Sequence, residues 1–243
     1  MKEMYELATN DFVGISFWII SAAMVAATAF FWMERDRAEG KWKTSLSVAA
    51  LVTGIAAIHY FYMRGFYVAS GGESPVVFRY VDWLLTVPLQ IVEFYLILAA
   101  IAVVRAALFW KLLVASLVML LGGFWGEAGL TDSVWLAFAI GMLGWLYIIY
   151  EIFVGEASQI NASSGTAASQ TAFNALKWIV TVGWAIYPIG YVLGVGAEAG
   201  TPEALAQSAN LNLVYNLADF VNKIAFGVVI WSAATSASAS SNN

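Results

Sequence analysis

The chain contains no cysteine and a single histidine, His59, among its 243 residues. The absence of cysteine excludes a disulfide framework, a cysteine-ligated zinc site and a thiol nucleophile. One histidine likewise excludes a metal site built from several histidine ligands. The chemistry of this chain has to come from other residue types.

Charged residues are also scarce. They make up 11% of the chain, against roughly a quarter in ordinary soluble domains, whereas hydrophobic residues make up 61%. The net charge is −5 and no large cluster of lysine and arginine is present, so nucleic-acid binding is not expected. These proportions predict a protein whose interior and outer surface are both apolar, with membrane lipid around it.

Several segments are long and apolar enough to cross a bilayer as helices, which requires roughly 20 residues each. Short polar links separate them, and the sequence shows no domain boundary and no strict internal repeat. Residues 1–243 are therefore predicted to form one all-α domain, a bundle of seven transmembrane helices. The spans are expected at residues 12–34, 44–64, 75–99, 106–126, 133–154, 171–195 and 207–233.

Lysine and arginine are distributed unequally between the two ends of this bundle. Only Lys2 and Arg64 lie at the end that holds the N-terminus. Because cytoplasmic links are enriched in these cations, the N-terminus is expected outside the cell and the C-terminus in the cytoplasm. The cations at the opposite end are Arg35, Arg37, Lys41, Lys43, Arg105, Lys111 and Lys177.

Lys223 lies deep inside the last span. Residues 224–231 follow it before the helix is expected to end, which is about 12 Å of helix and too far for easy snorkelling. A buried amine is pushed toward its neutral form, which is the nucleophile that condenses with aldehydes. Asp219 lies four residues earlier on the same helix face. A structural ion pair between the two is the alternative interpretation.

The third span carries Arg79, Asp82, Thr86 and Glu93. The first three project to one side of the helix, and Glu93 follows Asp82 by eleven residues, which is close to three turns or about 16 Å. One face thus holds a carboxylate in each half of the membrane, the geometry that a directed proton path needs. The alternative is a set of polar packing groups, although an uncompensated charge costs about 2.5–3.5 kcal/mol there.

Three segments of the chain resemble segments of the proteorhodopsins, which belong to the microbial rhodopsin family. Their third helix is similar to RYVDWLLTVPLQIVE at residues 79–93, and their retinal-bearing helix is similar to NLADFVNK at residues 216–223. The helix beside the retinal ring is similar to WAIYP at residues 184–188. The resemblance covers nearly the whole chain and implies a seven-helix bundle of the microbial rhodopsin type.

The resemblance implies that Lys223 binds all-trans retinal as a protonated Schiff base. Asp82 and Asp219 would supply its counterion, with Arg79 on their outer side. After illumination Asp82 would accept the proton, and Glu93 would return one from the cytoplasmic side. The chain would then be no enzyme but a light-driven transporter, which pumps protons outward across the inner (plasma) membrane of a bacterium.

The resemblance also assigns residues to the retinal pocket, although ordinary aromatic packing is an alternative for most of them. Gln90 occupies the family's colour-tuning position, where glutamine marks the blue-absorbing branch and leucine the green-absorbing one. The alternative for Gln90 is a polar group that only packs between helices. The residues expected to line the retinal are Trp83, Trp145, Trp184, Tyr187 and Pro188.

His59 lies on the second span, where a hydrogen-bonded core histidine is one interpretation. In proteorhodopsins a histidine at this position bonds the counterion. Trp18 would then approach it from a neighbouring subunit, which implies a ring-shaped homo-oligomer, a pentamer or a hexamer. Residues 34–36 (Glu-Arg-Asp) would either join subunits by ion pairs or lie solvated in a loop.

No residue is assigned to proton release at the outer side. Glu198 and Glu203 lie in the link before the last span, where solvated carboxylates are the better interpretation. Glu127, at the outer end of the fourth span, is another candidate.

A photosensory rhodopsin that signals through a partner protein is the alternative function. Glu93 argues against it, because sensory relatives usually lack a carboxylate at the donor position. A chloride pump would have a neutral residue in place of Asp82. Sodium pumps carry an Asn-Asp-Gln pattern where this chain has Asp82, Thr86 and Glu93.

Overall fold

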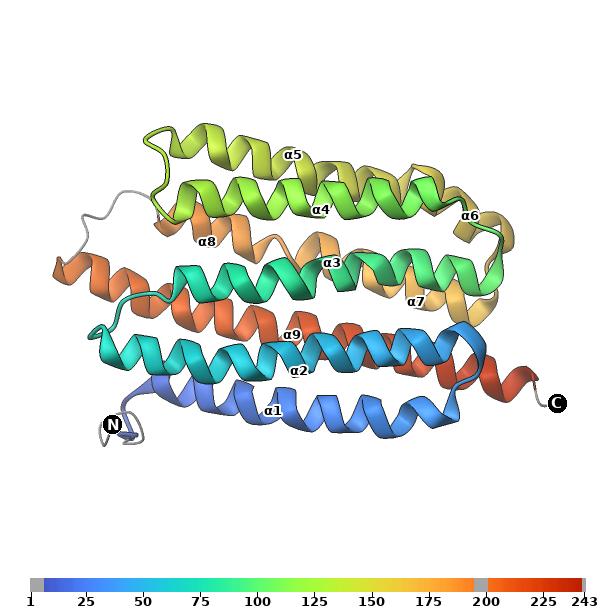
Figure 1. The fold of residues 1–243 in the computed structure, drawn as a ribbon, viewed down its shortest axis with the longest axis horizontal. Helices are drawn as coiled ribbons and strands as arrows, with labels where there is room; N and C mark the ends of the chain where they lie inside the picture. The colour runs from blue at the N-terminus through green and yellow to red at the C-terminus, as the bar shows by residue number, and fades with distance from the viewer. Residues whose placement is uncertain (1–6, 195–200, 242–243) are drawn as a thin grey trace.

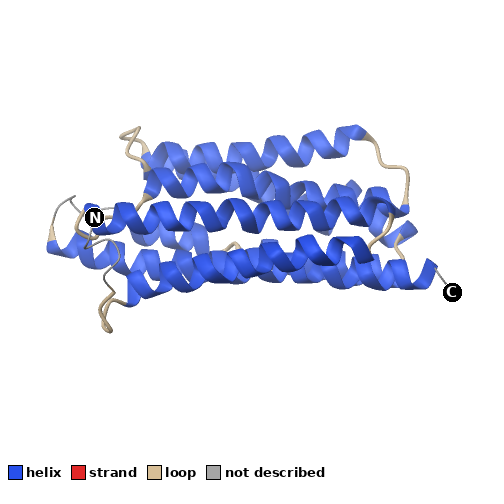
Figure 2. Cartoon of the chain, turned by 60° about the horizontal axis from the view of Figure 1, so that its bottom comes forward, coloured by secondary structure: helices blue, strands red, loops and turns tan. Residues whose placement is uncertain are grey.

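A computed structural model describes residues 7–194 and 201–241 of the chain. These residues form a bundle of long helices that lie side by side along one axis (Figure 1). A second view shows the described loops at the two ends of the bundle (Figure 2). In chain order the helices are α1 (Phe12–Glu34), the 3-10 helix η2 (Arg35–Arg37), α2 (Gly40–Ala69), α3 (Val76–Ile101), α4 (Ala106–Glu127), α5 (Val134–Phe153), α6 (Glu156–Ser164), α7 (Ala167–Trp178), the π-helix η3 (Ile179–Gly183), α8 (Ile186–Gly194) and α9 (Pro202–Ser241).

Seven stretches of the described chain are long and apolar enough to cross a membrane. This confirms the predicted number of spans. A membrane interior offers no water to backbone N–H and C=O groups, so helices that satisfy these groups internally are the form such segments take. With an odd number of crossings, α1 begins and α9 ends at opposite ends of the bundle (Figure 1).

The bundle has an apolar core with polar side chains buried within it, and it exposes apolar side chains on its outer face. Asp82, Thr86 and Asn216 have no exposed surface, whereas Leu143 and Val182 are 67% and 62% exposed on the outer face. In water this distribution would be unfavourable, but lipid is as apolar as the outward side chains. The buried polar residues form the candidate site inside the bundle.

Helices α4 and α5 approach each other through glycines. A Cβ atom added to Gly144 would lie 2.6 Å from both the carbonyl oxygen of Ala115 and the amide nitrogen of Met119. A Cβ atom on Gly122 would lie 2.6 Å from the amide nitrogen of Gly141. Small residues at such crossings let helix backbones pack closely in lipid, where no hydrophobic force drives helices together.

The sixth span is interrupted, whereas the sequence predicted one continuous helix at residues 171–195. The π-helix at Ile179–Gly183 is followed by a tight turn in which Tyr187 N donates to Trp184 O at 3.1 Å. Pro188 supplies the physical reason, because proline has no N–H and its ring clashes with the carbonyl four residues earlier. The indole of Trp145 and the amide of Asn222 donate to the carbonyl oxygens of Val180 and Gly183, both at 3.0 Å, and so support the break.

Other boundaries also differ from the prediction. The link expected at residues 155–165 contains the helix α6, and α2 and α9 extend beyond the predicted 44–64 and 207–233 at both ends. A hydropathy scan stops at charged residues such as Lys43 and Arg64. The helical backbone continues past them, because charges are tolerated at the ends of a span.

Candidate functional site

Lys223 on α9 lies between two carboxylates. Its Nζ is 3.0 Å from Oδ2 of Asp82 on α3 and 2.9 Å from Oδ1 of Asp219 on α9. The lysine side chain is 2% exposed and both carboxylates are fully buried. The structure thus brings together three residues that the sequence placed on two helices, and it buries an amine together with its compensating charges.

Asp219 is held by additional donors. Tyr60 and Tyr187 donate hydroxyl protons to its two oxygens at 2.8 and 2.7 Å, and the indole of Trp83 approaches both at 3.3 Å. The sequence did not single out Tyr60. The only available signal was a tyrosine one residue after His59 on a predicted span.

Asp82 has a much simpler environment. Apart from Lys223, its oxygens receive no hydrogen bond from the described residues. Thr86 donates to the backbone oxygen of Asp82 at 2.9 Å and not to its carboxylate. Hydrogen bonds favour the charged form of a carboxylate, so the two partners of Lys223 differ in how readily each accepts a proton.

His59 lies beside Asp82, with its Nδ1 atom 3.6 Å from Oδ1. The same nitrogen is 2.9 Å from the backbone oxygen of Ile55, which is the closer contact. The imidazole is 16% exposed and therefore reaches the outer surface of the bundle. Within this chain Trp18 packs edge-on against Phe61, with ring centroids 5.5 Å apart.

Arg79 lies one turn before Asp82 and is 1% exposed. One terminal nitrogen, NH2, donates to the side-chain oxygens of Asn212 and Asn216, each at 2.7 Å. The sequence did not single out these asparagines. Their spacing of four residues inside a membrane span was a signal that could have identified them, since polar groups there are seldom without a role.

Glu93 lies in the other half of α3 and is 1% exposed. Neither of its carboxyl oxygens has a hydrogen-bond partner among the described residues. Phe94 beside it packs edge-on against Phe173 and Phe226, at 5.3 and 6.4 Å. The Glu93 carboxyl group thus makes no contact with the polar cluster around Lys223, and the buried hydroxyl of Ser45 lies near it.

Gln90 is buried between α3 and α9. Its amide nitrogen is 3.4 Å from the backbone oxygen of Asn222, the residue before Lys223. The side chain thus lies close to Lys223, although it does not line the cavity described next.

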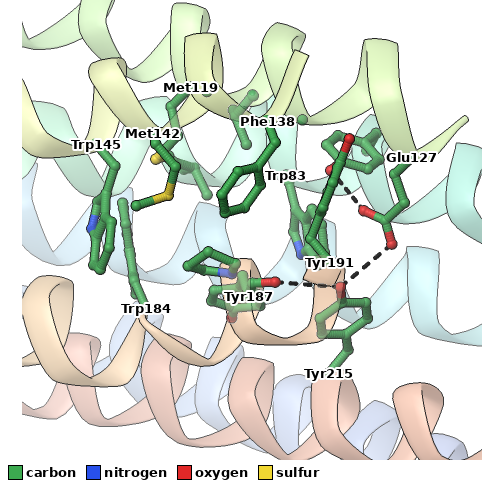
Figure 3. Close-up of a pocket in the computed structure, with 16 residues that line it drawn as sticks. Trp83, Met119, Glu127, Phe138, Met142, Trp145, Trp184, Tyr187, Tyr191 and Tyr215 are labelled. Carbon is green, nitrogen blue, oxygen red and sulfur yellow. Dashed lines mark hydrogen bonds between the residues drawn. The ribbon is translucent and has the colours of Figure 1, made fainter. Parts of the chain in front are cut away.

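A cavity with many aromatic lining residues lies between α3, α4, α5, α8 and α9 (Figure 3). It is lined by Trp83, Trp145, Trp184, Tyr187 and Pro188, which are the five residues expected to surround retinal. Lys223, Thr86 and Gln90 are not among its lining residues. Trp83 and Tyr187 connect the cavity to the lysine site, because both also bind Asp219.

The cavity fits an apolar, elongated chromophore. Its walls are aromatic and aliphatic side chains such as Met119, Phe138 and Met142, and flat rings present their faces to it (Figure 3). A buried amine with two carboxylates lies beyond the Trp83 and Tyr187 wall. An apolar pocket with a few placed polar groups is the usual form of a cofactor site.

Glu127, at the end of α4, also lines this cavity. Tyr80 and Tyr215 donate to its two carboxyl oxygens at 2.8 and 3.4 Å (Figure 3). Glu203 lies in the first turn of α9. Glu198, the other carboxylate considered for proton release, lies outside the described residues.

Residues 34–36, expected either to join subunits or to lie solvated, have partners within their own chain. Glu34 accepts from Arg37 at 2.7 Å and from the indole of Trp231 at 2.8 Å. Asp36 pairs with Lys43 at 2.9 Å.

Comparison with proteins of known sequence identifies the relatives of this chain. It is 56% identical to the blue-light absorbing proteorhodopsin of Gamma-proteobacterium Hot 75m4, over 94% of this chain and 88% of the relative. It is 54% identical to the green-light absorbing proteorhodopsin of Gamma-proteobacterium EBAC31A08, over 94% of this chain and 89% of the relative. The resemblance to proteorhodopsins is confirmed.

The fold agrees with this relationship. The crystal structure of blue light-absorbing proteorhodopsin from Med12 superposes with a TM-score of 0.77 at 58% identity, covering 93% of this chain and 99% of that chain. A family model described as "Bacteriorhodopsin-like protein" matches residues 11–237. The chain therefore belongs to the bacteriorhodopsin-like protein family, which implies a retinal chromophore.

Proposed function

We propose that this chain is a light-driven pump that moves protons outward across a bacterial inner membrane, with all-trans retinal bound covalently to Nζ of Lys223. The observation that carries the proposal is the pair of buried carboxylates at 3.0 and 2.9 Å from Nζ, with a third carboxylate, Glu93, isolated in the other half of the membrane. When bound, retinal supplies absorption of visible light and an isomerisation that changes the environment of Nζ.

Asp82 is the acceptor of the proton that Nζ loses. With the N-terminus outside the cell, Asp82 lies on the outer side of Lys223. Apart from Lys223, none of the described residues donates a hydrogen bond to its carboxylate. Asp219 remains ionised through the cycle, because two tyrosine hydroxyls and the Trp83 indole stabilise its charge. The difference between the two environments directs the proton to Asp82.

Glu93 returns a proton to Nζ from the cytoplasmic side. Its carboxyl group is buried and has no hydrogen-bond partner among the described residues, the setting in which a carboxyl group keeps its proton until a base becomes available. With Asp82 in the outer half and Glu93 in the inner half, uptake and loss of a proton at Nζ occur toward opposite sides. The inequality of lysine and arginine between the two ends of the bundle supports this orientation.

Gln90 places the chain in the blue-absorbing branch. The two curated relatives named above absorb different colours and are almost equally similar to this chain, so overall identity does not distinguish them. The amide of Gln90 lies 3.4 Å from the backbone of the residue before Lys223. A polar group near Nζ stabilises positive charge at this end of the chromophore and so widens the excitation gap.

A ring-shaped homo-oligomer, a pentamer or hexamer, completes the proposal. The imidazole of His59 lies 3.6 Å from Asp82 and is partly exposed on the outer face of the bundle, so a neighbouring subunit would reach it directly. Trp18 lies in a groove of about 530 Å³ that Phe61 and Phe78 also line. Through such a contact at His59, a conformational change in one subunit would affect Asp82 in the next subunit.

Illumination of unbuffered cells that express the chain with added retinal tests the proposal. We expect the external medium to become acidic in the light, and we expect a protonophore to abolish the change. Lys223→Ala cells serve as the matched control and should show neither the visible band nor the acidification. A retinal-dependent visible band without any light-induced pH change would reject the pump and favour the photosensory alternative.

A further inference from the structure

The guanidinium of Arg79 is bound by amides. Its NH2 group donates one hydrogen bond to Asn212 and one to Asn216, each at 2.7 Å. Within the described part of the chain no ion pair includes Arg79, because Asp82 and Asp219 pair with Lys223. A fully buried cation is therefore held by neutral acceptors, although two carboxylates lie on the neighbouring turns.

Two serines fix the orientation of these amides. The Asn216 nitrogen donates to Ser16 Oγ at 2.8 Å, and Ser16 donates to the Val13 carbonyl at 2.7 Å. The Asn212 nitrogen donates to Ser208 Oγ at 3.5 Å, and Ser208 donates to the Gly72 carbonyl at 2.9 Å. Each hydroxyl uses its one proton on a backbone carbonyl, so it accepts from the amide. Both amide oxygens must then face Arg79.

The remaining contacts of the guanidinium are weak. Its Cζ lies 5.3 Å from the ring centre of Tyr215 and 5.8 Å from that of Phe17. Its Nε and NH1 atoms have no hydrogen-bond partner in the described residues. The two asparagines therefore determine where the charge of Arg79 is located.

The position of this charge matters because many titratable groups surround it. In a buried site a unit charge acts on its neighbours far more strongly than in water. The groups that lie around Arg79 are Tyr60 on α2, Glu127 on α4, and Tyr215 and Asp219 on α9. The carboxylate of Asp82, one turn along α3, faces Lys223 on α9 and His59 on α2.

We propose that Asn212 and Asn216 form a neutral cradle that holds the guanidinium of Arg79 at a set distance from Asp82 and Asp219, and so determine the pH at which the counterion becomes protonated. The two asparagines are positioning residues, since they act on the counterion through Arg79. The inference deepens the proposed function in one respect, because it takes Asp82 and Asp219 as the counterion of bound retinal.

The test is a titration of the visible band in the dark, with the retinal-loaded full chain. Protonation of the counterion removes negative charge near Nζ and shifts the band to longer wavelength. Asn216→Asp places a carboxylate on Arg79 and weakens its action on the counterion, so the midpoint of this colour change should rise by about one pH unit. Asn216→Leu removes an acceptor and lets the guanidinium turn to Asp82 and Asp219, so the midpoint should fall by about as much.

Opposite shifts in the two variants would not arise from a merely structural role. Midpoints that move in the same direction, or that both stay within about 0.2 pH units of the parent value, would overturn the proposal. The measurement needs no light-driven transport. A chain that binds retinal but does not pump would therefore refute the proposed function. The dark titration would still decide this inference separately.

Ser16→Ala keeps the test decisive if the asparagine variants do not fold. Loss of this hydroxyl frees the Asn216 amide to rotate, so a smaller shift in the direction of Asn216→Leu is expected. Ser21→Ala is the matched control, because Ser21 is a buried serine on the same helix that donates only to the backbone oxygen of Phe17. Identical midpoints for these two serine variants would also overturn the proposal.

Discussion

The carboxylates of Asp82 and Asp219 approach the same ammonium group from two helices, at 3.0 and 2.9 Å, but only Asp219 is also bound by Tyr60, Trp83 and Tyr187. One carboxylate is thus part of a hydrogen-bonded network, and the other depends on Lys223. The asymmetry separates the residue that moves a proton from the residue that maintains the site.

Asp82→Asn and Asp219→Asn should therefore fail in different ways. Asp82→Asn should bind retinal, shift its band to longer wavelength and lose transport, since the acceptor is gone but the network remains. Asp219→Asn should also lose stability, because hydrogen bonds to a charged group are each worth about 1.5–3 kcal/mol. Light-induced acidification and thermal loss of the visible band measure the two effects. Equal loss of thermal stability in both variants would contradict the asymmetry.

Glu93→Gln should retain its colour and slow the return of a proton to Nζ by roughly 100-fold or more, the typical contribution of a positioned general acid. A flash experiment that follows recovery of the visible band measures the rate, and a small membrane-permeant weak acid should restore it. Glu151→Gln is the matched control, because Glu151 is a buried glutamate at 2% exposure that accepts from the backbone of Ala157. If both variants recover equally slowly, Glu93 is not the donor.

Gln90→Leu should shift the absorption maximum to longer wavelength. Leucine is of similar size but cannot stabilise positive charge near Lys223, so the excitation gap should narrow by about 1 kcal/mol, the net value of one hydrogen bond. A visible absorption spectrum of the purified protein is sufficient. Gln170→Leu, a change on α7 at a glutamine that binds the Asn161 carbonyl, should leave the band where it is. An unshifted band in Gln90→Leu would remove Gln90 from the chromophore site.

Gly144→Ala should destabilise the bundle. Its new Cβ atom would lie 2.6 Å from backbone atoms of Ala115 and Met119, which cannot yield as a side chain can. Overpacking of this kind costs typically 1–3 kcal/mol, which lowers the melting temperature of a chain this long by roughly 2–4 °C per kcal/mol. Thermal loss of the visible band provides the measurement.

The control for this change is Gly54→Ala. Its nearest neighbour is a methyl group of Thr28 at 3.3 Å, which can move slightly. A melting temperature that falls as far in Gly54→Ala as in Gly144→Ala would show that the close approach of α4 and α5 is not the cause.

Much of the fold followed from the sequence because lipid imposes a simple constraint. A span must be long, apolar and helical, so hydropathy located all seven spans, although α2 and α9 are longer than predicted at both ends. The interruption near Pro188 was missed. Proline alone does not predict how a helix will adapt, and here the adaptation depends on Trp145 and Asn222, which donate to the interrupted segment from other helices.

The candidate site, like the fold, could be predicted from the sequence only in part. By itself the sequence determined which residues share a helix face, because helical periodicity places Asp219 with Lys223 and Arg79 with Asp82. It did not determine how the faces of α3 and α9 meet. Packing of the helices against one another brings both carboxylates to one amine, lets Tyr60 and Tyr187 bind only one of them, and places Asn212 and Asn216 on Arg79. The reason is physical: contacts between helices depend on their rotation and depth, which are set by packing across the whole bundle.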